Sequence, residues 1–212
     1  MDSKENILIT SALPYVNNVP HLGNIIGCVL SADVWARYKK STNNNILYIC
    51  GTDEYGTATE TKARQENLTE KEICDKYHEI HKKVYQWFNI DFDYFGRTTT
   101  ENQTKIAQEI FMKIVENDLL IEKKSQQYFC PALNTFLADR YISGKCPYCG
   151  ASDANGDQCD NCGKLLDPIQ LINPFCKSNP ELEIVLKETE HLYIDLPKIE
   201  KELKQWFDQN KE

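Results

Sequence analysis

The sequence lacks the features of a membrane protein or a secreted protein. No stretch of its 212 residues approaches the roughly 20 consecutive apolar residues that a membrane-spanning helix needs. The first six residues contain neither the basic segment nor the apolar segment of a secretory signal peptide. These absences predict a cytoplasmic protein that does not contact a membrane.

Basic residues are too few for a surface that coats nucleic acid. The chain has 24 Lys and Arg against 32 Asp and Glu, which gives a formal net charge of −8. A protein that binds nucleic acid non-specifically carries a basic face, so this class is excluded. An enzyme that grips RNA through a confined patch remains compatible with the composition, which is otherwise that of a soluble globular protein.

The nine cysteines do not form the pattern of a disulfide framework. Their number is odd, and no secretory signal accompanies them. Cys28, Cys50 and Cys74 stand alone, whereas the other six fall between Cys130 and Cys176. In a reducing compartment the single cysteines are expected to be buried thiols and the cluster to bind metal.

Residues 1–117 alternate between strand and helix patterns. Short apolar runs at residues 7–10 and 46–50 predict strands that are buried on both faces. Helical patterns follow each of them, at residues 24–38 and up to about residue 67. This order predicts a parallel sheet with helical crossovers, and therefore an α/β fold.

Two further helices are predicted before residue 117. Thr69 with Glu72, and Thr98 with Glu101, have the spacing of capping boxes. The apolar face expected for the first helix comprises Ile73, Tyr77, Ile80, Val84 and Trp87.

The character of the chain changes at residue 118. Two short strand-like pieces, at residues 119–121 and 127–129, precede a stretch rich in Cys and Gly at residues 144–163. A last helix is expected from Leu196, with Pro197 in its first turn and an apolar side that includes Trp206 and Phe207.

The first candidate site follows the first predicted strand. A loop at the carboxyl end of a buried strand, opening into a helix, is where open α/β sheets bind ligands. Helix amides and the helix dipole favour a phosphate there, and His21 is placed to donate to it. A single histidine at a helix start is, by itself, more often a capping or packing residue.

The amino-acid sequence of this loop resembles a family signature. His21-Leu22-Gly23-Asn24 is similar to the His-Ile-Gly-His signature of class I aminoacyl-tRNA synthetases, which binds ATP. Asn24 replaces the second histidine; it can donate to a phosphate but carries no charge. The preceding Ala12-Leu13-Pro14-Tyr15-Val16-Asn17 resembles the methionine-specific members. The resemblance implies catalytic roles for His21 and Asn24. It also implies ATP binding by Pro14, Asn17, His21, Gly23 and Asn24, and methionine binding by Leu13 and Tyr15.

The second candidate site follows the second strand. Asp53 stands in Gly51-Thr52-Asp53-Glu54-Tyr55-Gly56, where a carboxylate could hold an ammonium group. The alternative is an ordinary solvated turn. The string resembles the matching segment of eukaryotic-type methionyl-tRNA synthetases, and this resemblance implies that Asp53 binds the α-amino group of methionine.

The third candidate site is a pair of Cys-x-x-Cys-Gly units. Cys146, Cys149, Cys159 and Cys162 have the spacing of a four-thiolate zinc site, in preference to an iron–sulfur cluster or disulfides. Four thiolates leave no open position, so the zinc is predicted to be structural. In many family members a second knuckle has cysteines where this chain has Leu133 and Asn179. Cys130 and Cys176 are then unpaired remnants, and one zinc ion is expected.

The resemblance to methionyl-tRNA synthetases runs from residue 7 to about residue 207. It implies the first half of a Rossmann-type catalytic domain in residues 1–117. Residues 118–212 would form the zinc-binding connective-peptide insertion. The implied reaction is that of a methionine–tRNA ligase, which uses ATP with Mg²⁺ to activate methionine and charge its tRNA. The family's Lys-Met-Ser-Lys-Ser loop has no counterpart here. The chain is therefore expected to be inactive alone and to need a missing C-terminal half, with other synthetases as further partners.

Three other functions stay open on the sequence. A non-catalytic zinc-binding module derived from a synthetase would share every motif. Another nucleotidyl transferase with a similar histidine loop would lack the four cysteines. A synthetase for leucine, isoleucine, valine or cysteine is the third, and its cysteine-specific form would need metal ligands close to Cys28 that are absent.

Overall fold

The computed structural model describes residues 4–210, and the chain divides into two compact units. The first is Met1–Gln108 and the second is Glu109–Glu212, so the division falls inside one helix, α5 (Glu101–Glu116). Among the described residues, no helix is long and apolar enough to cross a membrane.

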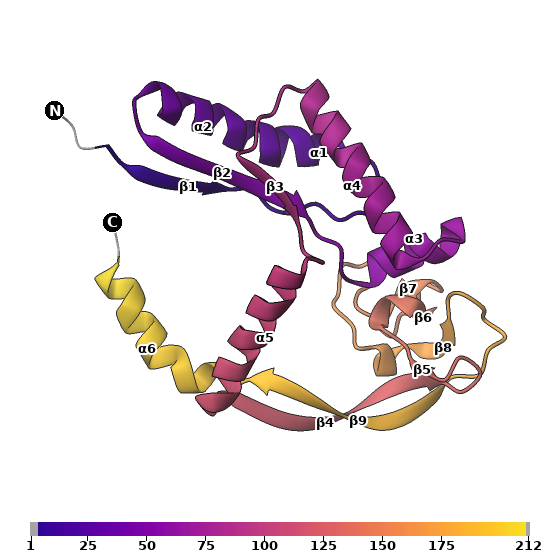
Figure 1. The fold of residues 1–212 in the computed structure, drawn as a ribbon. Helices are drawn as coiled ribbons and strands as arrows, with labels where there is room; N and C mark the ends of the chain where they lie inside the picture. Colours follow the sequence, from indigo (N-terminus) through magenta and orange to yellow (C-terminus); the bar gives the residue numbers. More distant parts are fainter. Residues whose placement is uncertain (1–3, 211–212) are drawn as a thin grey trace. The chain divides into compact units, whose positions relative to one another are not determined.

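The first unit is built on a three-stranded parallel sheet (Figure 1). The order of its strands is β1 (Asn6–Thr10), β2 (Asn45–Thr52) and β3 (Tyr94–Arg97). Both pairings are parallel, which confirms the sheet and the α/β fold that the alternating pattern predicts. The sequence did not predict β3, because a four-residue strand with a central glycine has no apolar run to identify it.

Helices cover one face of this sheet (Figure 1). The helix predicted at residues 24–38 is three consecutive pieces: α1 (Leu22–Asn24), the π-helix η1 (Ile25–Leu30) and α2 (Ser31–Ser41). Two more helices, α3 (Thr57–Glu66) and α4 (Glu70–Trp87), follow β2. The capping box of Thr69 and Glu72 at the start of α4 is confirmed.

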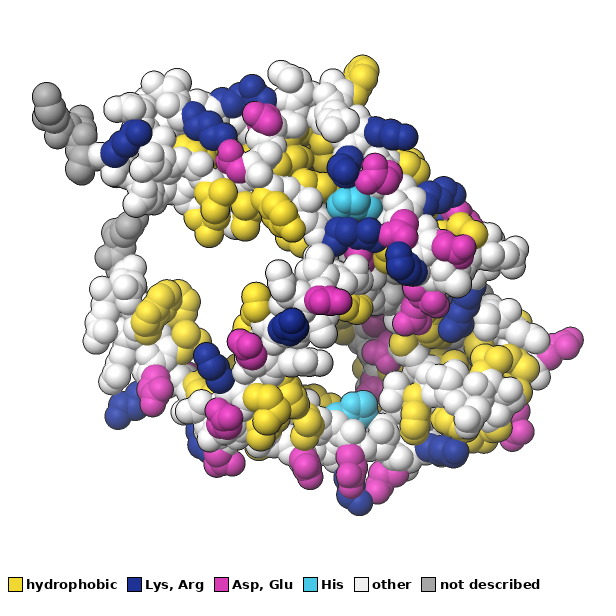
Figure 2. Space-filling model, viewed as in Figure 1, with side chains coloured by type: hydrophobic (Ala, Val, Ile, Leu, Met, Phe, Trp, Pro, Cys, Tyr) yellow, Lys and Arg dark blue, Asp and Glu magenta, His cyan; other side chains and the backbone are white. Residues whose placement is uncertain are grey.

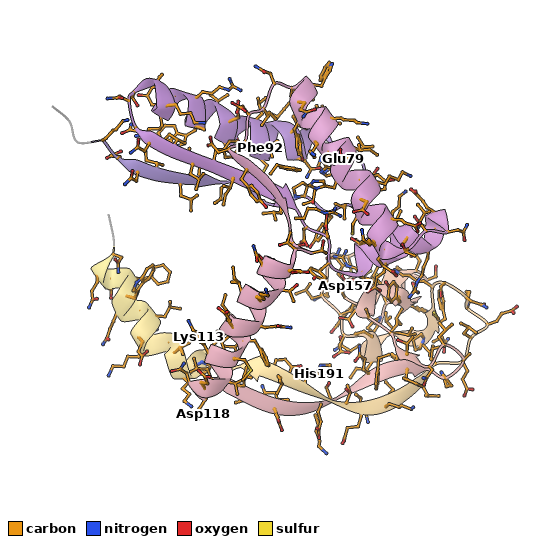
Figure 3. All side chains as sticks on the ribbon, viewed as in Figure 1. Glu79, Phe92, Lys113, Asp118, Asp157 and His191 are labelled. Carbon is orange, nitrogen blue, oxygen red and sulfur yellow. The ribbon has the colours of Figure 1, made fainter. Side chains whose placement is uncertain are left out.

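An aromatic cluster fills the space between the sheet and the helices. Phe92, labelled in Figure 3, has its ring centroid 4.9 Å from that of Tyr48, 5.8 Å from Tyr85 and 5.0 Å from Phe95. The buried Tyr48 hydroxyl donates to the carbonyl of Val29 at 2.8 Å, which ties β2 to η1. Burial of these rings, with hydrogen bonds for the hydroxyl groups of Tyr48 and Tyr85, anchors the helical layer on the sheet.

The other face of the sheet is uncovered. Leu8 and Leu47 are paired across β1 and β2 and are 60% and 51% exposed, and Tyr94 on β3 is 61% exposed. Figure 2 shows apolar side chains gathered along this side of the sheet. The prediction that both strands are buried on both faces therefore holds for one face only, because within the described part of the first unit no helix packs on this side.

Two details of the predicted helices are also corrected. Trp87 is 80% exposed and Tyr85 is 1% exposed. The buried face of α4 is rotated towards Cys74, His78 and His81, because two histidines are buried where the sequence pattern expects only apolar residues. At the start of α5, Thr100 instead of Thr98 caps the helix by accepting from the amide of Gln103 at 3.3 Å.

The second unit contains a long antiparallel ribbon. The two short strands predicted from the sequence are one strand, β4 (Leu120–Cys130), which pairs with β9 (Val185–Ile194) and with the short β5 (Thr135–Phe136). The polar middle of β4, Glu-Lys-Lys-Ser-Gln-Gln, hid its continuity, because both faces of that part are exposed to solvent. The ribbon pairs Leu120 with Ile194 at one end and Phe129 with Val185 at the other.

A second small sheet holds the core of this unit. Its strand order is β7 (Ala154–Asn155), β6 (Ile142–Lys145) and β8 (Ile172–Cys176), with short 3₁₀ turns η2 (Asp139–Tyr141) and η3 (Pro168–Gln170) beside them. The chain ends in α6 (Leu196–Gln209), with Pro197 in its first turn as predicted. The Lys198 ammonium donates to the carboxylate of Asp118 at 2.6 Å; Asp118 is labelled in Figure 3.

Candidate functional site

The loop after β1 is joined to the end of β2 by backbone hydrogen bonds. The amide of Asp53 donates to the carbonyl of Pro14 at 2.9 Å, and the amide of Val16 donates to the carbonyl of Asp53 at 3.2 Å. These bonds form a parallel bridge between Tyr15 and Asp53. Tyr15 and Asp53, 38 positions apart in sequence, therefore adjoin at the carboxyl edge of the sheet, where open α/β sheets bind ligands.

The same loop is fixed from the helical side. Val16 is fully buried in a cluster with Ile73 and Tyr77 of α4. The ring of His81, also on α4, donates from Nε2 to the carbonyl of Asn18 at 2.9 Å. Burial lowers the pKa of His81 below its ordinary value, so the neutral ring that makes this bond is favoured near neutral pH. The loop is thus attached both to the sheet and to α4.

His21 and Asn24 form a reciprocal cap at the start of the helical run. Nδ1 of His21 accepts from the amide of Gly23 at 3.0 Å, and Oδ1 of Asn24 accepts from the amide of His21 at 3.2 Å. Because the acceptor atom of each side chain is used, the neutral ring carries its proton on Nε2. Nε2–H of His21 and the amide hydrogens of Asn24 have no partner among the described residues. The pair therefore presents donors, which suit phosphate oxygens.

The absence of a side chain at Gly23 permits this arrangement. A Cβ at this position would lie 2.8 Å from Cε1 and 2.9 Å from Nδ1 of the His21 ring, closer than real contacts allow. With any other residue the ring would have to leave the cap. Gly23 thus determines the orientation of His21, in addition to leaving the backbone open on that side.

An open hollow lies against Asp53. Its volume is about 540 Å³. Leu13, Asp53, Tyr55 and Thr98 line it from the strand ends, and the first turns of α5 close it with Gln103, Thr104, Ala107 and Gln108. Asp53 is the one charged residue among these lining residues.

The structure brings together some of the predicted site residues and not others. Leu13 and Asp53 share the hollow, and Tyr15 is bonded beside Asp53 but is 55% exposed and does not line it. His21, Gly23 and Asn24 do not line this hollow either. Pro14 is buried and Asn17 is half-buried in the loop between the two groups.

Sequence reasoning did not single out Glu54, whose side chain is fully buried next to Asp53. Its carboxylate accepts from Nε of Arg97 at 2.7 Å and from the hydroxyl of Thr52 at 2.9 Å. A second acidic residue directly after Asp53 was the only local signal. The main partner of the Glu54 carboxylate is Arg97, which lies 43 positions away at the end of β3. The sequence did not predict this short strand either.

In the second unit the four cysteines predicted as zinc ligands converge. Their sulfur atoms all lie within 4.8 Å of one another, with Cys146 and Cys162 separated by 3.9 Å and Cys149 and Cys159 by 3.6 Å. Four thiolates about 2.3 Å from a tetrahedral zinc ion lie about 3.8 Å apart, so the cluster has the size that zinc requires. It could hold one zinc ion with no open coordination position.

The two Cys-x-x-Cys units have the same local backbone. The amide of Gly150 donates to the carbonyl of Cys146 at 3.0 Å, and the amide of Gly163 donates to that of Cys159 at 2.7 Å. Both glycines have positive φ, 77° and 70°, where a side chain would be strained. The Asn161 amide donates to the sulfur of Cys149, and mainly for this reason the pKa of Cys149 is lowered to about 6.

Cys130 and Cys176 are fully buried in the same core as Cys146 and Cys159. They end β4 and β8, and Cys176 lies 3.1 Å from the hydroxyl of Ser178. Among the described residues, the only group of three or more metal-ligating side chains is the four-cysteine cluster. Cys130 and Cys176 pack in this core as small apolar residues.

Comparison with known proteins identifies relatives along the whole chain. Residues 7–212 match the family model described as tRNA synthetases class I (M). The chain is 58% identical over 213 residues to the cytoplasmic methionine–tRNA ligase of Saccharomyces cerevisiae, and 58% identical over 204 residues to that of Homo sapiens. These matches cover 99% and 96% of this chain but 28% and 23% of the relatives, so the chain spans about a quarter of their length.

A solved structure with a similar fold is that of the Mycobacterium tuberculosis methionyl-tRNA synthetase in complex with methionyl-adenylate. Its TM-score is 0.66 at 16% identity, and the match covers 97% of this chain and 35% of the other. At this identity the likeness concerns the fold alone.

Proposed function

Because the chain belongs to the class I tRNA synthetases of the methionine type, we propose that it is the N-terminal part of a methionine–tRNA ligase. Its substrates are then methionine, ATP with Mg²⁺, and the methionine tRNA. Since the relatives are cytoplasmic ligases, the protein is placed in the cytoplasm. The observation that carries the proposal is the bridge between Tyr15 and Asp53, which joins the histidine loop to the carboxylate beside the hollow.

In this proposal the methionine lies in the hollow. The Asp53 carboxylate binds its ammonium group and Leu13 contacts its side chain within the hollow, while Tyr15, which does not line the hollow, contacts the methionine from its place beside Asp53. Aspartate suits this role because a charge-assisted hydrogen bond to an ammonium group is stronger than a neutral one. The hollow is otherwise lined by uncharged side chains, which suits an uncharged thioether.

The histidine loop binds the ATP. Nε2–H of His21 and the amide of Asn24 donate to phosphate oxygens, Gly23 leaves room beside the backbone, and Pro14 and Asn17 complete the contacts. The reaction joins the methionine carboxylate to the α-phosphate, releases pyrophosphate and gives methionyl-adenylate. His21 and Asn24 act by stabilising negative charge on the phosphate as it reacts, so their role is electrostatic. Transfer of the methionyl group to the tRNA follows.

Residues 1–117 are the first half of the catalytic domain, and residues 118–212 are the connective-peptide insertion. The end of α5 at Glu116 and the positive φ of 54° at Asp118 support a boundary at the end of this helix. One structural zinc ion bound by Cys146, Cys149, Cys159 and Cys162 holds the insertion together. The uncovered sheet face, with Leu8 and Leu47, is covered by the C-terminal part of the ligase, and the 212-residue chain alone is inactive.

Methionine-dependent exchange of pyrophosphate into ATP tests the proposal, measured on the full-length protein that contains this segment. The wild type is expected to show exchange with methionine, and the 212-residue chain none. Asp53→Asn should raise the KM for methionine, and His21→Ala should lower kcat by about 10²–10³-fold, the usual cost of one oxyanion-stabilising donor. Exchange that responds to another amino acid, or none at all, would refute the assignment.

A further inference from the structure

We propose that Glu54 and Arg97 are positioning residues that clamp the two walls of the methionine hollow. This inference rests on the function proposed above. One wall is the end of β2, with Asp53 and Tyr55. The other is the segment after β3, with Thr98, and the start of α5.

Glu54 is hydrogen-bonded to three consecutive residues of the second wall. Its carboxylate accepts from Nε of Arg97 at 2.7 Å and from the hydroxyl of Thr99. Its backbone amide donates to the hydroxyl of Thr98 at 3.0 Å. Thr98 lines the hollow, and the residue before Glu54 is Asp53, so one buried side chain connects both walls within one residue of each.

Two residues of α4 make further contacts with this network. The hydroxyl of Thr52 donates to Glu54 at 2.9 Å and lies 2.8 Å from Nδ1 of His78. Because the hydroxyl has only one proton to donate, Nδ1 of the neutral His78 ring carries the hydrogen of the second bond. Arg97 makes a further ion pair with Asp75 of α4, with its terminal nitrogen 2.7 Å from the carboxylate. Every donor in this network points at a carboxylate or a hydroxyl, so the wall spacing is set by directional bonds.

Neither clamp residue lines the hollow, so their effect on the substrate is indirect. A buried carboxylate that lost its arginine would lie unpaired beside Asp53, and the segment from Arg97 to Thr99 would lose its attachment to β2. Misplacement of the wall by a fraction of an ångström weakens contacts with a small ligand more than it weakens the fold. The expected signature is therefore a higher KM for methionine at nearly constant kcat and constant KM for ATP.

A second buried carboxylate, paired with an exposed arginine, provides a control. Asp33 on α2 is 3% exposed, accepts from Nε of Arg37 at 2.6 Å and accepts from the amide of Asp91 at 2.9 Å. Asp91 precedes β3, so this pair lies at the amino ends of the strands, whereas Glu54 lies at their carboxyl ends. Asp33→Asn removes the same kind of interaction without touching the hollow.

The test compares pyrophosphate exchange by full-length wild type, Glu54→Gln, Arg97→Lys, Thr99→Val and Asp33→Asn, with thermal unfolding of each. Glu54→Gln is expected to raise the KM for methionine about tenfold, equivalent to ~1.4 kcal/mol. Arg97→Lys keeps the charge but cannot make both contacts, and should have a smaller effect in the same direction. Thr99→Val removes a single hydrogen-bond donor and should raise the KM for methionine about threefold. This variant tests the proposal if Glu54→Gln does not fold. Asp33→Asn should lower the unfolding temperature and leave the KM unchanged.

The proposal is overturned if Glu54→Gln and Thr99→Val keep the wild-type KM for methionine, or if Asp33→Asn raises it equally. In either case the network is structural only. A wild type without methionine-dependent exchange would instead refute the proposed function itself, and the inference with it.

Discussion

Mild acid is expected to destabilise the first unit through two buried histidines. His78 and His81 on α4 are 6% and 1% exposed. Burial lowers the pKa of both below the ordinary value of 6.5, and for His78 the neighbouring Arg97 lowers it further. Glu54 and Glu79 act in the opposite direction on His78 but do not outweigh burial. Both rings are therefore neutral in the folded protein at a pH where they are protonated in the unfolded chain.

The sign and size of the effect follow from proton linkage. Below pH 6.5 the unfolded chain binds more protons than the folded one, so the free energy of unfolding falls as the pH falls. Each histidine contributes a slope of at most about 1.4 kcal/mol per pH unit, and the two together about 2.8 kcal/mol, until the pH passes their folded pKa values. Carboxylates with lowered pKa values, such as Asp75 and Asp93, act in the same direction only at lower pH. The range from pH 6.5 to 5.5 therefore isolates the histidines.

Urea unfolding at pH 7.5, 6.5 and 5.5 measures this slope. A Trp206→Phe background leaves Trp35 and Trp87 as the only tryptophans, so fluorescence reports on the first unit alone. His81→Gln keeps a donor at the position of Nε2, and His78→Asn keeps one at the position of Nδ1. Each should remove about half of the pH dependence between pH 6.5 and 5.5. A free energy of unfolding that stays constant or rises as the pH falls would refute the argument, as would an unchanged slope in both variants.

Two further predictions concern the metal and a close backbone contact. Chelation of the metal, or Cys159→Ser, should unfold the second unit and leave Met1–Gln108 resistant to protease, because structural zinc contributes ~10 kcal/mol or more, as much as a whole domain's stability. Mass spectrometry should find one zinc per chain, and two would refute the single site. Gly51→Ala would place a Cβ 2.7 Å from the carbonyl oxygen of Gly96 across β2 and β3 and should cost about 1–3 kcal/mol. Gly27→Ala, which meets nothing within 4 Å, is its control, and equal unfolding temperatures would contradict the contact.

The elements that the sequence predicted are those with strong local signals. β1 and β2 are apolar runs, α4 begins with a capping box, and the zinc cysteines have a fixed spacing that few other structures use. β3 and β9 were missed because their pairing partners, which stabilise them, are distant in sequence. In the same way, the face of α4 was misjudged because His78 and His81 are buried by hydrogen bonds to Thr52 and Asn18, which no periodicity shows.

The candidate site was also predictable only in part. Leu13 and Asp53 were named from the sequence, and the structure places both on one hollow. The burial of Glu54 could not be inferred, since an acidic residue in a turn is ordinarily solvated and only its pairing with Arg97 makes burial possible.

The antiparallel ribbon in the second unit makes the segment between its two strands separable from its surroundings. β4 leads away from Leu119 and β9 returns to it, where the amide of Asp195 donates to the carbonyl of Leu119 at 2.8 Å. Everything between, including the four-cysteine cluster, is connected through a two-stranded ribbon whose ends are hydrogen-bonded to each other. Evolution can therefore lengthen, shorten or replace that segment, and an engineer can swap it for a tight turn, while the residues that enter and leave the ribbon keep their places.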